Sequence, residues 1–324
     1  MRELSNILLT GATGFVGYYL LGQLADRERI KVEVALRSDR DFDHCLSHAV
    51  GDFADKTCWS NALTDKQVVI HAAARAHIMK DEAADPLAEY RRVNVAGTLN
   101  LARQAAAAGV KRFIFISSIK VNGERTLGNA RFTHLDIPAP EDAYGVSKAE
   151  AESGLLALAE ETGLEVVIIR PPLVYGPGVK ANFASLLNLV NKGTPLPFGA
   201  ITSNRRSLVS VHNLVDLIIT CIDHPKAANK IFLVSDDHDL STAQMIDEMS
   251  RALGVSKRNF PLPLWIFDLA GKVLRKEAVV ARLTGSLSLD ISYTKETLGW
   301  TPPQSVASGF KETAISFNEI MGSQ

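Results

Sequence analysis

The segment Asn6-Ile-Leu-Leu-Thr10-Gly11-Ala-Thr-Gly14-Phe-Val-Gly17 decides the fold. Its first five residues form an apolar run of strand length, and the helical pattern Tyr18 to Leu24 follows the last glycine. Gly11 permits a tight turn, Gly14 lets the backbone approach a pyrophosphate, and Gly17 allows the helix to pack closely on the strand. The N-terminus of the helix then faces the phosphates. This strand, turn and helix therefore predict a dinucleotide-binding site.

Strands and helices alternate beyond this segment. The expected elements are strands at Val68–Ile70, Phe113–Ile116 and Val166–Ile169, and helices at Pro86–Ala108 and Ala143–Glu161. Continuous apolar strands that alternate with helices are typical of a parallel sheet covered on both faces. The predicted fold class is α/β, a Rossmann-type doubly wound parallel sheet.

The pattern changes after Arg170. Five prolines interrupt the next segment, and the later helices are separated by longer loops. We therefore expect a dinucleotide-binding domain at residues 1–170 and a smaller substrate-binding region at residues 171–324. A strand near residues 231–235 is expected to return to the sheet, so the two regions interleave.

The end of the second apolar run bears on the choice of cofactor. An acidic residue about twenty residues beyond the last glycine would bind the ribose 2′-hydroxyl of NAD. Arg37 stands there instead, with Arg40 close behind, and both suit a 2′-phosphate. NADP is therefore favoured, and NAD stays open if the arginines point into solvent. Asp52, with Phe53 beside it, is expected at the adenine, although Asp52 could simply begin a turn.

The stretch Tyr144-Gly-Val-Ser-Lys148 places a phenol and an ammonium four residues apart at the start of a predicted helix. This spacing puts both side chains on one helix face, where the lysine charge can lower the pKa of the phenol. A tyrosine of this kind can exchange a proton with a substrate oxygen near neutral pH. The alternative is a solvated helix face, because the spacing is common in helices.

Composition excludes several classes of partner. The 324 residues are 46% hydrophobic with a net charge of −1, so we expect no nucleic-acid binding. Three cysteines without metal-ligand spacing, and no leader segment, indicate a reduced, cytoplasmic protein with no metal site. The apolar stretch Leu262 to Leu274 is too short to span a membrane. We interpret it as a packing helix, with contact to a membrane surface as the alternative.

From about Asn6 to Pro302 the chain resembles an extended short-chain dehydrogenase/reductase of the nucleotide-sugar epimerase and reductase group. The motifs that carry the resemblance are Thr10-Gly-Ala-Thr-Gly-Phe-Val-Gly17, His71-Ala-Ala-Ala74, Asn94 in Val93-Asn-Val-Ala-Gly-Thr98, Ser117-Ser118, Tyr144-x-x-x-Lys148, Arg170-Pro-Pro-Leu-Val-Tyr-Gly-Pro-Gly178, and Arg206 before Val209-Ser-Val-His-Asn213. Such proteins also bring their two long helices together across a twofold axis, which implies a homodimer.

The resemblance implies a role for each matching residue. Ser118 would bind the reacting sugar oxygen, Tyr144 would be its acid/base, and Lys148 would hold the nicotinamide ribose. Asn182 and Arg206 would contact the substrate diphosphate, for which an arginine fork is suited. The residues implied at the cofactor are Gly11, Thr13, Gly14, Phe15, Val16, Arg37, Asp52, Phe53, Ala72, Ala73, Ala74, Asn94, Tyr144, Lys148, Pro171 and Val174.

Departures from the family pattern guide the choice of reaction. Dehydratases of this group place an Asp-Glu pair where this chain has Ile119 and Lys120, so dehydration is not expected. Many 4-epimerases carry an asparagine at the place of Leu173 and a tyrosine at the place of Asn122. Together with Arg37, these differences favour an NADPH-dependent reductase of a 4-keto-6-deoxy nucleotide sugar. The alternatives are a UDP-sugar 4-epimerase with tightly bound NAD, a reductase of a non-sugar carbonyl, and a non-catalytic cofactor sensor.

Overall fold

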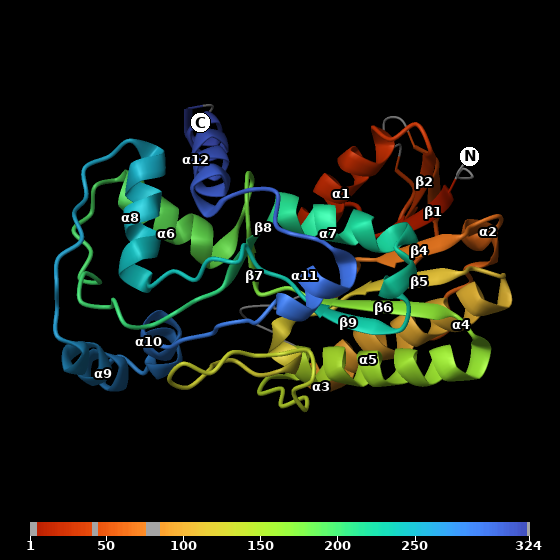
Figure 1. Ribbon diagram of the computed structural model, residues 1–324, viewed down its shortest axis with the longest axis horizontal. Coiled ribbons are helices and arrows are strands. Elements are labelled where there is room, and N and C mark those ends of the chain that lie inside the picture. Colours follow the sequence, from red (N-terminus) through yellow and green to blue (C-terminus); the bar gives the residue numbers. More distant parts are fainter. Residues whose placement is uncertain (1–4, 41–44, 76–84, 323–324) are drawn as a thin grey trace.

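A seven-stranded parallel sheet forms the centre of the molecule (Figure 1). The computed structural model describes residues 5–40, 45–75 and 85–322. The strand order is β3-β2-β1-β4-β5-β6-β9, and all six neighbouring pairs are parallel. The strands are β1 (Ser5–Thr10), β2 (Ile30–Leu36), β3 (Ser47–Ala49), β4 (Val68–His71), β5 (Arg112–Ile116), β6 (Glu165–Arg170) and β9 (Lys230–Leu233). The predicted fold class, including the returning strand, is confirmed.

Helices cover both faces of this sheet. On one face α1 (Phe15–Ala25) and α7 (Val211–Asp223) pack side by side over an apolar core, with α11 (Ser292–Leu298) beyond them. On the other face lie α2 (Ser60–Leu63), α4 (Thr98–Ala107) and α5 (Ala143–Thr162), which bury a second core that includes Trp59. Because both faces are covered, the strands are apolar on both sides.

Strand order reverses at β1, which lies between β2 and β4. At such a reversal the loops at the carboxyl ends of two neighbouring strands diverge and leave a crevice. The loops after β1, β2 and β4 begin at Gly11, Arg37 and Ala72, so the predicted cofactor residues converge on this crevice.

The predicted helix Pro86–Ala108 is continuous but not uniform. It consists of α3 (Pro86–Tyr90), the π-helical segment η1 (Arg91–Gly97) and α4. A Cβ atom on Gly97 would lie 2.7 Å from the carbonyl oxygen of Phe53, so the wide turn ends where the helix touches the loop after β3. π-Helical turns are often found at functional sites, and apolar periodicity does not reveal them.

A third apolar core lies beyond the sheet. It is built from the rings of Tyr175, Phe183 and Phe310 and is enclosed by α6 (Ala181–Asn191), α8 (Thr242–Leu253) and α12 (Val306–Gly322). The remaining elements are η2 (Ile119–Val121), β7 (Leu173–Tyr175), β8 (Leu208–Ser210), η3 (Pro225–Ala227), α9 (Leu264–Val273) and α10 (Glu277–Thr284).

The stretch Leu262 to Leu274 forms α9, but it packs less completely than we predicted. Phe267 and Gly271 are buried, whereas Trp265, Leu269 and Val273 are exposed. In the part of the chain that the structure describes, no helix combines the length and the hydropathy that crossing a membrane requires.

His71, at the end of β4, links the sheet to α4. Its Nδ1 lies 2.7 Å from Thr10 Oγ1, and its Nε2 lies 3.0 Å from Thr98 Oγ1. Burial, with a smaller effect of Lys148, lowers the pKa of His71 from 6.5 to about 3. The folded protein therefore keeps this imidazole neutral through the range in which the unfolded chain protonates it.

We predict that His71 makes the fold sensitive to acid. Between pH 6.5 and about 3 only the unfolded chain takes up the proton, so the free energy of unfolding falls as pH falls. In urea unfolding, wild type should lose about 2 kcal/mol more than His71→Gln between about pH 7.5 and about pH 5. Equal losses in the two proteins would show that His71 does not cause the sensitivity.

Candidate active site

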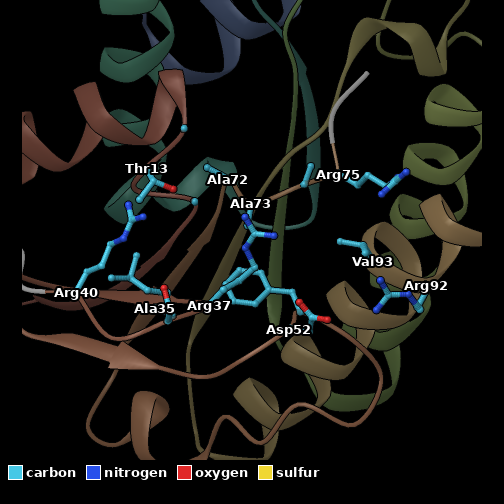
Figure 2. A pocket seen from close by; sticks show the side chains of 16 residues that line it. Thr13, Ala35, Arg37, Arg40, Asp52, Ala72, Ala73, Arg75, Arg92 and Val93 are labelled. Atoms are coloured by element: carbon cyan, nitrogen blue, oxygen red, sulfur yellow. The ribbon is translucent and has the colours of Figure 1, made fainter. Parts of the chain in front are cut away.

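A pocket of about 480 Å³ lies at the carboxyl ends of β1, β2 and β4 (Figure 2). Nine residues predicted to bind the cofactor line it: Gly11, Thr13, Gly14, Arg37, Asp52, Phe53, Ala72, Ala73 and Ala74. Ala35, Leu36, Ser38, Arg40, Arg75, Arg92 and Val93 complete the lining. The structure thus brings together residues from five separate stretches of the sequence.

The glycine turn fits a dinucleotide because it leaves no room for side chains. Gly11 has a φ of +79°, and a Cβ atom there would lie 2.5 Å from the backbone nitrogen of Ala73. A Cβ atom on Gly17 would lie 2.1 Å from the carbonyl oxygen of Gly11. No side chain caps the N-terminus of α1, which begins after Gly14. Its first N–H groups are therefore available to a pyrophosphate.

Four arginines surround the pocket, and sequence reasoning identified only two of them. Figure 2 shows Arg37 and Arg40 on the β2 side, and Arg75 and Arg92 on the side of the helices. The Arg75 guanidinium lies 5.5 Å from the centre of the Tyr90 ring, and Arg92 pairs with Glu89 at 3.2 Å. Arg75 directly follows the alanine run after β4, and this position was the signal in the sequence that could have placed it in the pocket.

Asn94 holds the backbone of Arg75, one of the residues that line the pocket. Its Oδ1 accepts a hydrogen bond from the Arg75 backbone N–H at 2.8 Å, and its Nδ2 donates to the Arg75 carbonyl at 3.1 Å and to Ser147 Oγ at 3.0 Å. The amide thus ties the loop after β4 to α5.

The three predicted catalytic residues come from two neighbouring elements. Ser118 follows β5 at the start of η2, and its Oγ accepts from the Lys120 backbone N–H at 3.2 Å. Tyr144 lies in the first turn of α5, which Asp142 caps by accepting from the Gly145 N–H at 2.7 Å. Lys148 lies one turn further along the same face, with its Nζ 5.9 Å from the centre of the Tyr144 ring.

The electrostatics of this pair differ from the prediction. Lys148 is buried, donates to the Ile116 carbonyl at 2.8 Å and lies 4.2 Å from the centre of the Phe115 ring. Burial lowers the pKa of Lys148 to about 7, against a smaller opposing effect of Glu152. The pKa of Tyr144 is raised rather than lowered, first by burial and then by Asp142 and Tyr90. Spacing alone could not show that desolvation outweighs the lysine charge.

A buried ion pair lies beneath these residues. Arg170, at the end of β6, donates from Nε to both carboxylate oxygens of Glu152, at 3.0 Å and 3.1 Å. Its Nη1 donates to Asn122 Oδ1 at 2.8 Å, and Ser117 Oγ donates to the same carboxylate. Glu152 lies one turn beyond Lys148 on α5, so the pair connects this helix to the ends of β5 and β6.

The other predicted residues lie outside the pocket lining. Phe15 and Val16 open α1, Pro171 is buried after β6, and Val174 lies in β7. Asn182 is exposed in the first turn of α6.

Arg206 is half-buried. Its Nη1 donates to the backbone carbonyls of Arg282 at 3.0 Å and Gly285 at 3.3 Å. Burial lowers its pKa, and the nearby charge of Arg282 adds to that effect. Arg282 is therefore a second cation beside the predicted diphosphate residue, and sequence reasoning missed it.

The described residues hold no group of three histidine, cysteine, aspartate or glutamate side chains that could bind a metal ion.

Comparisons with known proteins identify the family of this chain. The model of the NAD dependent epimerase/dehydratase family matches residues 7–235. A UDP-glucose 4-epimerase of Vibrio cholerae is 58% identical over 312 residues, which cover 96% of this chain and 95% of that protein. An N-acetyl-α-D-glucosaminyl-diphospho-ditrans,octacis-undecaprenol 4-epimerase of Escherichia coli O157:H7 is 29% identical, covering 85% of this chain and 83% of that protein.

Among solved structures, a UDP-glucuronic acid 4-epimerase of Bacillus cereus in complex with NAD shares the fold with a TM-score of 0.78. It is 20% identical and covers 97% of this chain and 99% of that one. The predicted resemblance to an extended short-chain dehydrogenase/reductase is confirmed. The chain belongs to the NAD dependent epimerase/dehydratase family and is an enzyme of that family.

Proposed function

We propose that the protein is a UDP-sugar 4-epimerase that keeps NAD bound. The observation that carries this proposal is that α5, which holds Tyr144 and Lys148, is tied through Asn94 to the lining of the glycine-turn pocket. The chain is also 58% identical to a UDP-glucose 4-epimerase. The sequence alone favoured a 4-ketoreductase, with epimerisation as the alternative. The V. cholerae relative supports that alternative better.

One of the departures that argued against epimerisation has a structural explanation. Asn122 replaces a tyrosine of many 4-epimerases, but its Oδ1 accepts from Arg170 and its Nδ2 donates to the Thr133 carbonyl at 3.0 Å. The residue holds the buried network together, so it is not evidence for a different reaction. Leu173 has no comparable explanation.

The proposed mechanism assigns one task to each residue. Tyr144 accepts the proton of the sugar C4 hydroxyl and later returns it, while Ser118 donates a hydrogen bond to the same oxygen. A bound nicotinamide supplies the acceptor and donor of hydride at C4. The raised pKa of Tyr144 means that its phenol carries a proton near neutral pH. It can therefore take up the C4 proton only as the phenolate, which a charged Lys148, with its Nζ 5.9 Å from the ring centre, would favour. That ammonium loses its proton as pH rises through about 7.

The diphosphate is the expected anchor of the substrate. The V. cholerae relative is named for a UDP-sugar, and the E. coli relative for a sugar joined through a diphosphate to undecaprenol. Both substrates contain the diphosphate. Arg206 and Arg282 provide two neighbouring cations for it, beside the third apolar core.

A second candidate is the NADPH-dependent 4-ketoreductase. Arg37 and Arg40, both in the pocket lining, favour it because guanidinium groups there suit a 2′-phosphate. Denaturing the purified protein and assaying the released cofactor separates the candidates. Stoichiometric NAD supports the epimerase. An empty site that then takes up NADPH supports the reductase.

We predict that Tyr144→Phe retains cofactor and lowers turnover by at least about a hundredfold, because the ring stays while the proton carrier is lost. The measurement is the rate of interconversion of UDP-glucose and UDP-galactose. Tyr18→Phe, which removes the hydroxyl of an exposed tyrosine on α1, is the control and should leave the rate unchanged. Near-normal turnover of Tyr144→Phe would remove this residue from the mechanism.

We also predict that Arg37→Asp discriminates between the two cofactors. Loss of a charge-assisted hydrogen bond, worth about 1.5–3 kcal/mol, should weaken NADPH binding roughly ten- to a hundredfold and leave NADH nearly unchanged. Titration of both cofactors measures the effect. Arg92→Asp, the same charge change across the pocket, is the control and should affect the two cofactors alike. If Arg37→Asp also shifts both cofactors equally, Arg37 does not contact the 2′-phosphate.

A further inference from the structure

The outward face of α9 is apolar. Trp265, Leu269 and Val273 follow one another at four-residue intervals, which places them on one side of the helix, and they are 64%, 55% and 72% exposed. The opposite side holds Phe267, whose ring stacks on that of Phe198 with centres 5.8 Å apart. One side of α9 thus packs on the protein, and none of the described residues covers the other side.

Exposed apolar side chains are concentrated in this part of the molecule. Seven of the seventeen large apolar side chains that are exposed among the described residues lie between residues 260 and 279. In Figure 1, α9 and its neighbour α10 lie at the opposite end of the molecule from β1 and β2. Single exposed apolar residues are ordinary, whereas a concentration of this kind indicates an interaction surface.

The same surface is basic. Lys272, Arg275 and Lys276 are all exposed at the C-terminal end of α9. The ion pairs found among the described residues include none of the three. Asp268 is the one acidic residue of the segment from 264 to 276, so the segment carries +2 (three basic minus one acidic) in a chain whose net charge is −1.

We propose that α9 docks this protein on an anionic phospholipid surface. An interfacial helix buries its apolar side chains at the boundary between headgroups and acyl chains, where tryptophan is favoured, while nearby cations bind anionic headgroups. Trp265, Leu269 and Val273 supply the first component, and the three cations supply the second. A second copy of the chain is the alternative occupant of this face, and the oligomeric state tests it.

Docking in this way has a consequence for the substrate site. The helix α9 packs against α10, where a Cβ atom on Gly271 would lie 3.0 Å from Val280 Cγ2. Arg282, also on α10, lies beside Arg206. The proposed diphosphate site would then lie near the membrane surface; this consequence, unlike the docking itself, rests on the proposed function.

The experiment uses the fluorescence of Trp265. Of the three tryptophans in the chain, Trp59 is fully buried and Trp300 is 5% exposed, so a change of environment outside the core reports Trp265. The full chain is titrated with phosphatidylcholine vesicles and with vesicles that also contain phosphatidylglycerol. We expect a blue shift, and quenching by brominated acyl chains, only with the anionic vesicles.

Two variants and a control test the apolar side chains and the cations of the surface separately. The measurement is the fraction of protein that floats with the vesicles. The combined variant Lys272→Gln, Arg275→Gln and Lys276→Gln should bind anionic vesicles roughly a hundredfold more weakly. The combined variant Leu269→Ser and Val273→Ser should bind at least about tenfold more weakly. The matched control Ile315→Ser and Ile320→Ser, which changes exposed apolar residues of α12, should bind like wild type.

Each of the other outcomes would overturn the proposal. These are no binding of wild type to either vesicle, equal binding to both vesicles, and undiminished binding of the variant that lacks the three cations. A further contrary result is an oligomer that Leu269→Ser and Val273→Ser disrupt while vesicles are not bound, because it would identify a second copy as the occupant. Thermal unfolding midpoints close to that of wild type confirm that the variants fold.

Discussion

The buried ion pair between Glu152 and Arg170 is the interaction on which the geometry of the candidate active site depends. It fixes α5 against the carboxyl ends of β5 and β6, and the same carboxylate accepts the Ser117 hydroxyl. Tyr144 and Lys148 precede Glu152 on one face of α5, so the position of the pair sets the position of both. Removing one partner of such a pair typically costs about 3–5 kcal/mol, because the other charge stays buried alone.

The two buried cations of this arrangement differ in their partners. The Arg170 guanidinium is satisfied by a carboxylate and an amide, whereas the Lys148 ammonium has one carbonyl and an aromatic face. Lys148 therefore has a pKa of about 7. Perturbed pKa values of this kind are concentrated at functional sites. The pocket of the glycine turn lies on the other side of β4.

Local sequence signals predicted the fold well and the site in part. The glycine turn, the apolar strands and α5 follow from short-range chemistry, and nine of the residues predicted to bind the cofactor line one pocket. The π-helical turn in η1 depends on contact between Gly97 and the Phe53 loop, which are distant in sequence. Likewise, the fold alone brings three further arginines to the two sites: Arg75 and Arg92 to the pocket, and Arg282 to Arg206. The raised pKa of Tyr144 follows from its burial, and the uncovered face of α9 from the exposure of its side chains. Residue spacing reports neither burial nor exposure.

Return of hydride to the carbon from which it came distinguishes epimerisation from the other reactions of this active-site arrangement. The most direct measurement is to supply UDP-galactose deuterated at C4, without added cofactor, and to follow the label by mass spectrometry and NMR. The account predicts UDP-glucose that retains the deuterium at C4, because one bound nicotinamide accepts and returns it. Absence of product without added NADPH, or product that has lost the label, would contradict the account.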